Sequence, residues 1–467
     1  MQKREGGYFM SNENKNITPQ DECVVADKFQ WSDLYKKEDW WAIWLGFIII
    51  FAGIISVTTE AFTFKAVKFS TWGNGTSILS VMTGEYFMQL AFSFVVLLVL
   101  FCVGAYFMGH DVKKFAIAFT GLFFLSWIAY ILSAQATMKN YLEYAFWALA
   151  VGLLVSNTIG TPEWLKPALI SEYYVKTGLV VMGAEVLFSN ITNFGIYGLA
   201  IAWFVTPVVI IFMWLFGTKF LKMVSKPMVI VIATATSVCG VSAAIAAAAA
   251  AGAKRNDLTF AIGLSLMFTV LMMVFMPIGI KAVGMDPLVG GAWIGGTVDS
   301  TGAVVLAGEA LGPVGGQVAA LVKMIQNILI GFIALAISIF FAMNVENEDG
   351  CREKVGAAEI WHRFPKFILG FFAASVLFSF VIMPTFGDEA YSAILKTFSN
   401  FKGWCFCLTF TAIGLESNFK EMAYYMQGGK PMTLYVVGQT FNLVLTLLVA
   451  WIMLSGVFFP IPEIFTI

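Results

Sequence analysis

One carboxylate stands inside an apolar run that is long enough to enter a membrane. Asp299 lies in the run 290–309, and the small and hydroxyl residues around it are Gly296, Thr297, Ser300, Thr301 and Gly302. An ionisable side chain at membrane depth is costly and is usually functional. Because carboxylate and hydroxyl oxygens can hold a proton or a cation, we predict that Asp299 binds a coupling ion. The alternative is an ordinary aspartate in a short turn outside the membrane.

A second run, 228–251, begins with small polar residues and continues as a stretch of alanines. Its polar positions are Thr236, Ser237, Cys239, Gly240 and Ser242. A break in a membrane helix frees amides and carbonyls, so it is tolerated only where it is buried or lines an aqueous cavity. The partial positive charge of a helix N-terminus favours an anion. We therefore predict an anion-binding helix N-terminus here, with a packing seam of small residues as the alternative.

Three other charged residues fall in or at the ends of apolar runs. Lys323 lies near the start of the run 317–343, with Asn327 one turn further on the same face. It could supply the counter-charge for an anion or neutralise Asp299, although a snorkelling lysine is the alternative. Glu185 and Glu416 end their runs at matching places in a faint repeat, which favours ion coupling over an interfacial position.

The overall composition requires a membrane protein. Of 467 residues, 59% are hydrophobic and only 12% are charged, whereas soluble proteins carry roughly a quarter charged residues. At about 20 residues for each crossing, the chain holds about 11–13 membrane segments, so we predict an all-α polytopic fold. The 28 basic and 29 acidic residues leave no charge pattern for a nucleic-acid partner.

The residues that usually bind metals or cofactors are scarce. The two histidines, His110 and His362, lie in polar segments between the runs, and the six cysteines show no zinc-site or disulfide spacing. No nucleotide-binding motif is evident. We expect no metal, no cofactor other than a coupling ion, and no enzymatic activity.

The order of the runs suggests the topology. Residues 1–40 form a polar tail, and residues 41–467 form a transmembrane domain with runs at roughly 42–58, 86–108, 114–137, 142–157, 172–188, 195–217, 228–251, 258–283, 290–309, 317–343, 365–385, 398–416 and 431–456. With the N-terminus in the cytoplasm and every run crossing, most basic loops are cytoplasmic. Lys254 and Arg255 are the exception, because their loop would then lie outside the cytoplasm. The exception disappears if 228–251 is re-entrant, that is, if it enters the membrane and returns to the same side. A second re-entrant element at 290–309 then restores the downstream topology, and both possibilities stay open.

An internal repeat is faintly visible. The segments 177–190 and 409–420 are both apolar stretches that end in Gly-x-Glu, with Ser-Asn close behind. The repeat halves are roughly 41–220 and 258–456. Inverted repeats are typical of secondary transporters.

With these residues identified, the chain resembles the YeiH-like sulfate exporter family of bacterial membrane proteins. The resemblance covers about residues 145–456 and rests on three motifs: Thr-Ser-Val-Cys-Gly-Val-Ser-Ala at 236–243, the glycine-rich stretch 295–308, and Ala310–Pro313 leading to Val322 and Lys323. It implies an antiporter-like fold, with two inverted repeats and interrupted helices that meet near the middle of the membrane. A homodimer is one option by the same analogy.

The chain also departs from the family pattern. It has Asp-Ser-Thr-Gly-Ala at 299–303 where the family is expected to have His-Glu-Thr-Ala-Gln. Gln326 replaces an expected arginine, and another arginine expected near Glu185 is absent. The loss of basic groups argues against a sulfate-like dianion as the substrate.

We therefore predict a secondary active transporter of a small anion in the bacterial inner membrane. The substrate is an oxyanion such as sulfate or sulfite, or an organic sulfonate or carboxylate. The anion would bind at Thr236–Ser242 and at Gly296, Thr297, Ser300, Thr301, Lys323 and Asn327, while Asp299, with Glu185 or Glu416, would bind a proton or sodium. The alternatives are a cation/proton antiporter that uses Asp299 and, from another class, a membrane-embedded enzyme or a sensor.

Overall fold

The chain folds entirely into helices in a computed structural model that describes residues 30–462, except 61, 138–143, 345–357 and 421–428. These residues contain no β-strand, only two isolated bridges. The prediction of an all-α fold is confirmed, and each predicted apolar run falls on a helix. Eight helices in the described part are long and apolar enough to cross a membrane: Glu38–Thr59, Gly84–Phe107, Val112–Ser133, Phe188–Phe220, Arg255–Ala282, Pro313–Met343, Phe367–Glu416 and Gly429–Leu454.

This count is lower than the predicted 11–13 segments because several runs form shorter helices. The runs 365–385 and 398–416 fall in two helices that meet at Gly387, where the backbone is non-helical, and the count takes them together as one segment, Phe367–Glu416. The runs 228–251 and 290–309 each break into two helices of 9 to 12 residues. A helix of that length spans about 14–18 Å, roughly half of a bilayer core.

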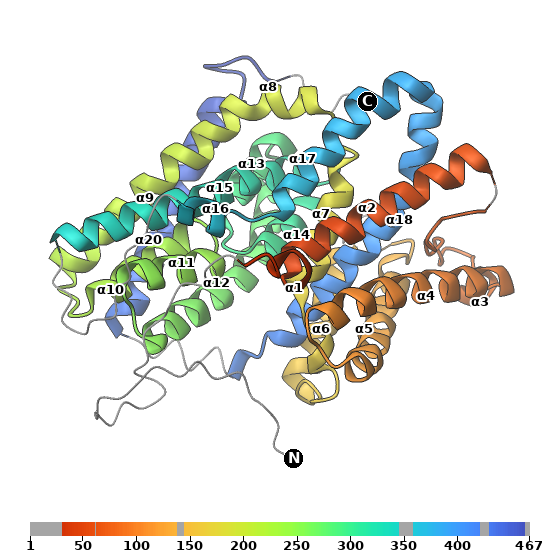
Figure 1. Ribbon diagram of the computed structural model, residues 1–467, viewed down its shortest axis with the longest axis horizontal. Helices are drawn as coiled ribbons and strands as arrows, with labels where there is room; N and C mark the ends of the chain where they lie inside the picture. Colours follow the sequence, from red (N-terminus) through yellow and green to blue (C-terminus); the bar gives the residue numbers. More distant parts are fainter. Residues whose placement is uncertain (1–29, 61, 138–143, 345–357, 421–428, 463–467) are drawn as a thin grey trace.

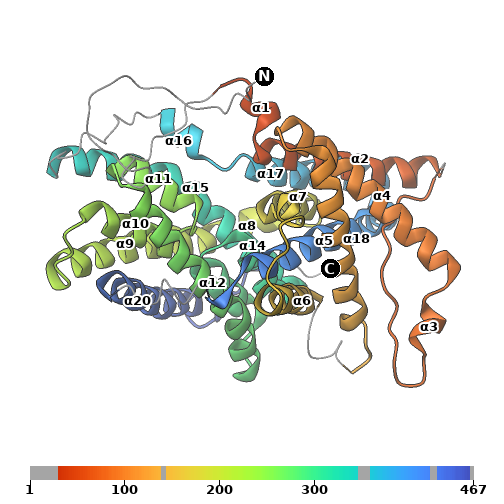
Figure 2. The same ribbon diagram turned by 90° about the horizontal axis from the view of Figure 1, so that it is seen from below.

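The helices gather into two lobes, which Figures 1 and 2 show side by side. Lobe 1 comprises α2 (Glu38–Thr59), α4 (Gly84–Phe107), α5 (Val112–Ser133), α6 (Tyr144–Thr158), α7 (Ser171–Gly183), α17 (Phe367–Leu377) and α18 (Met383–Glu416), with the short α1 (Asp33–Lys36) and α3 (Ile78–Val81) at its edges. Lobe 2 comprises α8 (Phe188–Leu199), α9 (Val205–Leu215), α10 (Lys226–Ser237), α11 (Ser242–Ala251), α12 (Arg255–Ala282), α13 (Pro287–Thr297), α14 (Thr301–Glu309), α15 (Pro313–Asn344) and α20 (Gly429–Leu454). The short α16 (Ala358–Arg363) precedes α17.

In lobe 2, α13 and α14 form a helical hairpin, called hairpin 2. Gly291 and Gly295 of α13 lie against Gly315 and Ala319 of α15, and Gly308 of α14 lies against the same two residues. Both arms therefore run along one stretch of α15. A Cβ at Gly295 would stand 2.6 Å from the Ala319 carbonyl oxygen, so glycine permits this close approach.

The helices α10 and α11 form a second hairpin, called hairpin 1. The Ser225 hydroxyl, just before α10, donates a 2.8 Å hydrogen bond to Asp257 in the first turn of α12. Because α12 begins only a few residues after α11 ends, the start of α10 and the end of α11 lie at the same level. The turn of hairpin 1 lies instead beside Ser265, about 12 Å beyond Asp257 along α12.

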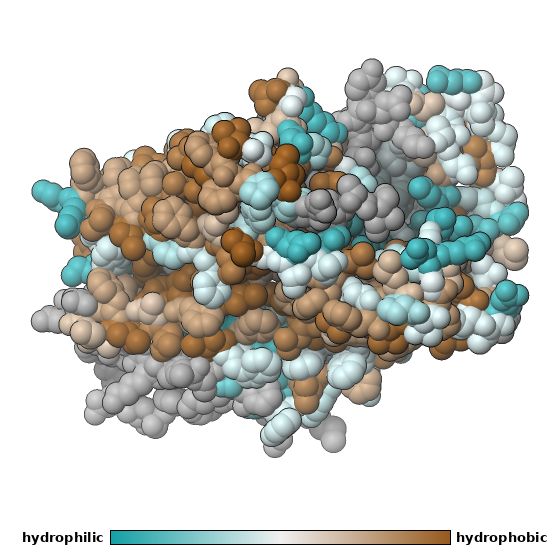
Figure 3. Space-filling view, turned by 90° about the horizontal axis from the view of Figure 1, so that it is seen from above, coloured by the Kyte–Doolittle hydropathy of each residue, from teal (hydrophilic) through white to brown (hydrophobic). Residues whose placement is uncertain are grey.

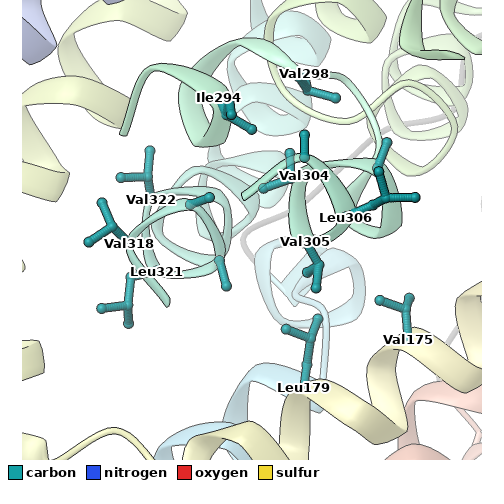
Figure 4. Close-up of a cluster of buried hydrophobic side chains, with 14 of the residues drawn as sticks. Val175, Leu179, Ile294, Val298, Val304, Val305, Leu306, Val318, Leu321 and Val322 are labelled. Atoms are coloured by element: carbon teal, nitrogen blue, oxygen red, sulfur yellow. The ribbon is translucent and has the colours of Figure 1, made fainter. Parts of the chain in front are cut away.

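The two lobes meet along α7 and α14. One buried cluster includes Val175 and Leu179 of α7 and Val305 of α14 (Figure 4). The outer surface is rich in exposed large hydrophobic side chains, and hydrophobic residues cover much of the face in Figure 3. An apolar exterior of this kind suits lipid as the surrounding solvent.

Candidate functional site

The turns of the two hairpins touch each other inside lobe 2. The Gly240 amide in the turn of hairpin 1 donates a 2.9 Å hydrogen bond to the Asp299 carbonyl in the turn of hairpin 2. Since Gly240 also packs against Ser265, a side chain at this position would collide with the serine hydroxyl. The two predicted breaks, far apart in sequence, thus form one site.

Lys323 joins the two turns from α15. Its Nζ donates to the carbonyl oxygens of Val238 and Val298, the latter at 2.8 Å, and to Gln326 Oε1 at 2.8 Å. These carbonyls follow the C-terminal ends of α10 and α13, where helical carbonyls lack partners and the helix dipole is negative. Lys323 is buried, and its ammonium group faces the negative C-terminal ends of α10 and α13.

Gln326 continues this network. Its amide nitrogen donates to the carbonyl oxygens of Ser237 at 2.9 Å and Gly296 at 3.2 Å, and to the Thr206 hydroxyl at 3.2 Å. An arginine at this position could not accept the bond from Lys323, because guanidinium has no acceptor. Glutamine in place of the expected arginine therefore fits the contacts of this chain.

The Asp299 carboxylate points toward α12 and α20. One oxygen, Oδ2, accepts hydrogen bonds from the Tyr435 hydroxyl and from Ser265 at 2.9 Å. The other, Oδ1, is buried without a hydrogen-bond partner. Asp299 is only 1% exposed, so the aspartate is not a loop residue in solvent.

A polar face of α20 supports the site and was not predicted from the sequence. Tyr435, Gln439, Asn442 and Thr446 are all buried at helical spacing. Gln439 donates to the Thr297 carbonyl at 3.1 Å and Asn442 to the Thr236 carbonyl at 3.2 Å. The polar residues at this spacing in the run 431–456 were the available signal.

A cavity of about 120 Å³ opens beside the turns, and Asp299 is not among its lining residues. Its lining from lobe 2 includes Cys239, Ser242, Thr301 and Asn327. Ser242 begins α11, the second helix of hairpin 1, and Thr301 begins α14, the second helix of hairpin 2. The N-termini of these two helices therefore face one cavity. The Asn327 amide donates to the Thr301 hydroxyl at 3.2 Å.

The other wall of the cavity comes from lobe 1 and the segment before α17. It includes Asp39, Glu172, Lys176, His362, Arg363 and Phe367. Lys176 forms ion pairs with Asp39 at 2.8 Å, with Glu172 at 3.6 Å and with Glu38. The cavity therefore lies between the lobes and has charged groups from lobe 1 facing the hairpins.

The remaining predicted residues take different positions. The Thr236 and Ser237 hydroxyls donate to the carbonyls of Ile232 and Ala233 in their own helix, at 2.8 and 2.6 Å. The Thr297 hydroxyl is buried without a partner, and Ser300 is half-buried just before α14. These residues shape the two turns, whereas Cys239, Ser242, Thr301 and Asn327 line the cavity.

The two repeated glutamates lie apart from the paired turns. Glu185 accepts a 2.5 Å hydrogen bond from Lys402 of α18. Glu416 is exposed and accepts a 3.3 Å hydrogen bond from Ser171. Within the described residues, no cluster of His, Cys, Asp or Glu could hold a metal ion.

Comparisons with known proteins identify the family. The family model described as conserved hypothetical protein 698 matches residues 117–435. The chain belongs to this family, UPF0324. The predicted resemblance is confirmed, because the UPF0324 family is the YeiH-like one.

The relatives are bacterial membrane proteins. A UPF0324 membrane protein of Nitratidesulfovibrio vulgaris is 53% identical over 78% of this chain and 63% of its own length. One from Rhodopirellula baltica is 50% identical over 78% of this chain and 68% of its own length. A more distant one from Nitrosomonas europaea is 28% identical over 94% and 99% of the two chains. The chain thus spans less than two thirds of the length of the Nitratidesulfovibrio relative. No solved structure matches the chain.

Proposed function

We propose that this UPF0324 protein is a secondary active transporter of a small anion, and not an enzyme. The observation that carries the proposal is the cavity onto which the N-termini of α11 and α14 both open. Each helix N-terminus holds about half a positive charge and unpaired amides, so two of them favour an anion of one unit charge. Cys239, Ser242, Thr301 and Asn327 supply polar groups around it.

This geometry changes the role that we assign to Lys323. Its ammonium group is occupied by the carbonyls at the helix ends, so the helix N-termini, and not Lys323, supply the counter-charge for the anion. Sulfite, sulfate, an organic sulfonate and a carboxylate are the substrate classes to test. Asp299, which does not line this cavity, binds the coupling proton or sodium ion.

We also propose that both hairpins are re-entrant and enter the membrane from opposite sides. Hairpin 1 has its base at the start of α12, and hairpin 2 follows the end of the same helix. Lys254 and Arg255 then join the other basic loops in the cytoplasm, together with the N-terminus. The helices α7 and α18, which carry the start of the copy 177–190 and most of the copy 409–420, pack against each other at Gly178 and Phe406. Glu185 pairs with Lys402 and Ser171 with Glu416, so the two copies run antiparallel, as inverted repeats require.

Transport in proteoliposomes tests the function. We expect the wild-type chain to accumulate at least one of sulfate, sulfite, a short sulfonate or a short carboxylate when a proton or sodium gradient is imposed. Asp299→Asn removes the ionisable group while it keeps the shape, so it should abolish accumulation against a gradient. Circular dichroism and the elution profile in detergent should match the wild type.

Two outcomes contradict the proposal. Coupled accumulation by Asp299→Asn at the wild-type rate would remove Asp299 from the mechanism. A cation/proton exchange that needs no anion, with none of the anions transported, would support the alternative of a cation/proton antiporter.

A further inference from the structure

Three residues at the place where α20 crosses the turn of hairpin 2 each have a buried oxygen atom without a hydrogen-bond partner. These atoms are Asp299 Oδ1, Thr297 Oγ1 and Gln439 Oε1, and each residue is at most 3% exposed. Buried polar atoms without partners are rare and costly, so such a group calls for an explanation.

The contacts of α20 hold these oxygens in one neighbourhood. The Gln439 amide nitrogen lies 3.1 Å from the Thr297 carbonyl oxygen. One helical turn earlier, the Tyr435 hydroxyl contacts Asp299 Oδ2. Since Thr297 and Asp299 are two residues apart, α20 presents Tyr435 and Gln439 across this short segment.

The charges around the turns leave room for one positive charge. Asp299 contributes a full negative charge, and the C-terminal ends of α10 and α13 contribute about half a negative charge each. Lys323 contributes one positive charge at those ends. The sum on the Asp299 side is therefore about one negative charge, while the N-termini of α11 and α14 carry about one positive charge on the cavity side.

We propose that the coupling ion is Na⁺, and that Asp299, Thr297 and Gln439 bind it through these three oxygens. The inference rests on the proposed function and deepens it by naming the ion. A carboxylate, a hydroxyl and an amide oxygen form a hard ligand set that suits a cation such as Na⁺. The net charge suits a monovalent cation better than a divalent one.

A proton fits the same site less well. In this arrangement the Thr297 hydroxyl, itself a donor, bonds to neither of the other two oxygens, and a proton on Asp299 Oδ1 has no bonded acceptor among them. A single Na⁺ contacts all three and neutralises the charge. It also gives a physical reason for coupling, because the anion at the α11 and α14 N-termini and the cation at Asp299 are held by the same two turns.

The first test needs only the wild-type protein. Its thermal unfolding midpoint in detergent should rise with NaCl concentration in a saturable manner. KCl and choline chloride at the same ionic strength should have no such effect, because ligand binding stabilises only the form that binds it. Equal shifts with all three salts would overturn the proposal.

Variants then locate the site. Thr297→Val and Gln439→Leu keep nearly the same volume but remove an oxygen ligand, and each should weaken the apparent Na⁺ affinity at least tenfold. Thr234→Val is the matched control, since the Thr234 hydroxyl donates to Ile230 in its own helix, at 2.7 Å, and should leave the Na⁺ response unchanged. If the two site variants respond to Na⁺ as the wild type does, the ion binds elsewhere.

Transport separates this inference from the proposed function. Anion accumulation driven by a pH gradient in Na⁺-free vesicles would overturn the sodium site and leave the anion transporter intact. A Na⁺-specific thermal shift without transport of any anion would leave the sodium site and contradict the transporter proposal.

Discussion

Lys323 is the residue whose single side chain connects both hairpin turns. Lys323→Met keeps the aliphatic volume but leaves Val238 O, Val298 O and Gln326 Oε1 without their donor. At about 1–3 kcal/mol for each buried unsatisfied group, we expect a loss of about 3 kcal/mol or more in the free energy of unfolding. The measurement is the apparent Tm in detergent, which should fall clearly.

Lys281→Met serves as the control, because Lys281 is exposed at the last turn of α12. This substitution should change the apparent Tm very little. If both variants unfold at the wild-type temperature, Lys323 does not hold the turns together, and the reason for replacing Lys323 by the helix N-termini as the anion's counter-charge is lost.

At the scale of single residues, the sequence predicted which positions matter better than it predicted their contacts. Asp299, Lys323 and Thr301 were identifiable because polar residues in an apolar run are costly. Their partners depend on how distant helices pack, which no spacing rule specifies. Gln439 and Tyr435 escaped notice because α20 also contains exposed polar residues such as Thr440, and only burial separates the two faces.

At the scale of helices, the proposal that both hairpins are re-entrant makes a prediction about sidedness. Val224 precedes hairpin 1 and Lys254 follows it, so single cysteines at these positions should react with a membrane-impermeant thiol reagent from the same side. Val283 and Pro313 flank hairpin 2, and cysteines there should react from the other side. Val224, Val283 and Pro313 are exposed, and Lys254 is half-buried.

The experiment uses intact cells and inverted vesicles, on a background in which reactive native cysteines are replaced by serine. Positions 224 and 254 labelled from opposite sides would mean that 228–251 crosses the membrane. The same result for positions 283 and 313 would mean that 290–309 crosses. Equal accessibility from both sides at one position would indicate an aqueous path instead.

The sequence predicted where helices occur because apolar runs determine helices in lipid. The sequence did not decide whether the runs 228–251 and 290–309 cross the membrane or return to the side from which they enter, because both arrangements use residues of the same composition. The glycines of α13 and α14 were the relevant signal. Gly291, Gly295 and Gly308 allow two short arms to lie on one stretch of α15, but the partner surface is needed to see that.

At the scale of the whole molecule, the cavity lies between two lobes that hold different parts of the site. Lobe 2 contains both hairpins, Asp299 and Lys323, so a movement of this lobe would carry the anion and the cation together. Lobe 1 contributes Lys176 and its acidic partners to the facing wall. This division suggests that lobe 2 moves against lobe 1 during transport.

A disulfide between the lobes tests that movement. A Cβ built at Gly302 of α14 lies 3.4 Å from Thr409 Cγ2 of α18, so side chains at these two positions touch across the lobes, and Gly302→Cys with Thr409→Cys is the pair to oxidise. Oxidation of this pair should stop coupled transport, and a reducing agent should restore it, because the bond fixes the lobes in one arrangement. Each single variant should transport under both conditions.

The matched control places a disulfide inside lobe 1. A Cβ built at Gly53 of α2 lies 2.6 Å from Thr397 Oγ1 of α18, so side chains at these positions meet within lobe 1, and Gly53→Cys with Thr397→Cys is the control pair once mass spectrometry shows that it oxidises. That bond joins helices that stay together, and transport should survive its oxidation. Full transport with the Gly302–Thr409 bond formed would mean that the α14–α18 contact does not change, and that the site opens by motion of the hairpins within lobe 2.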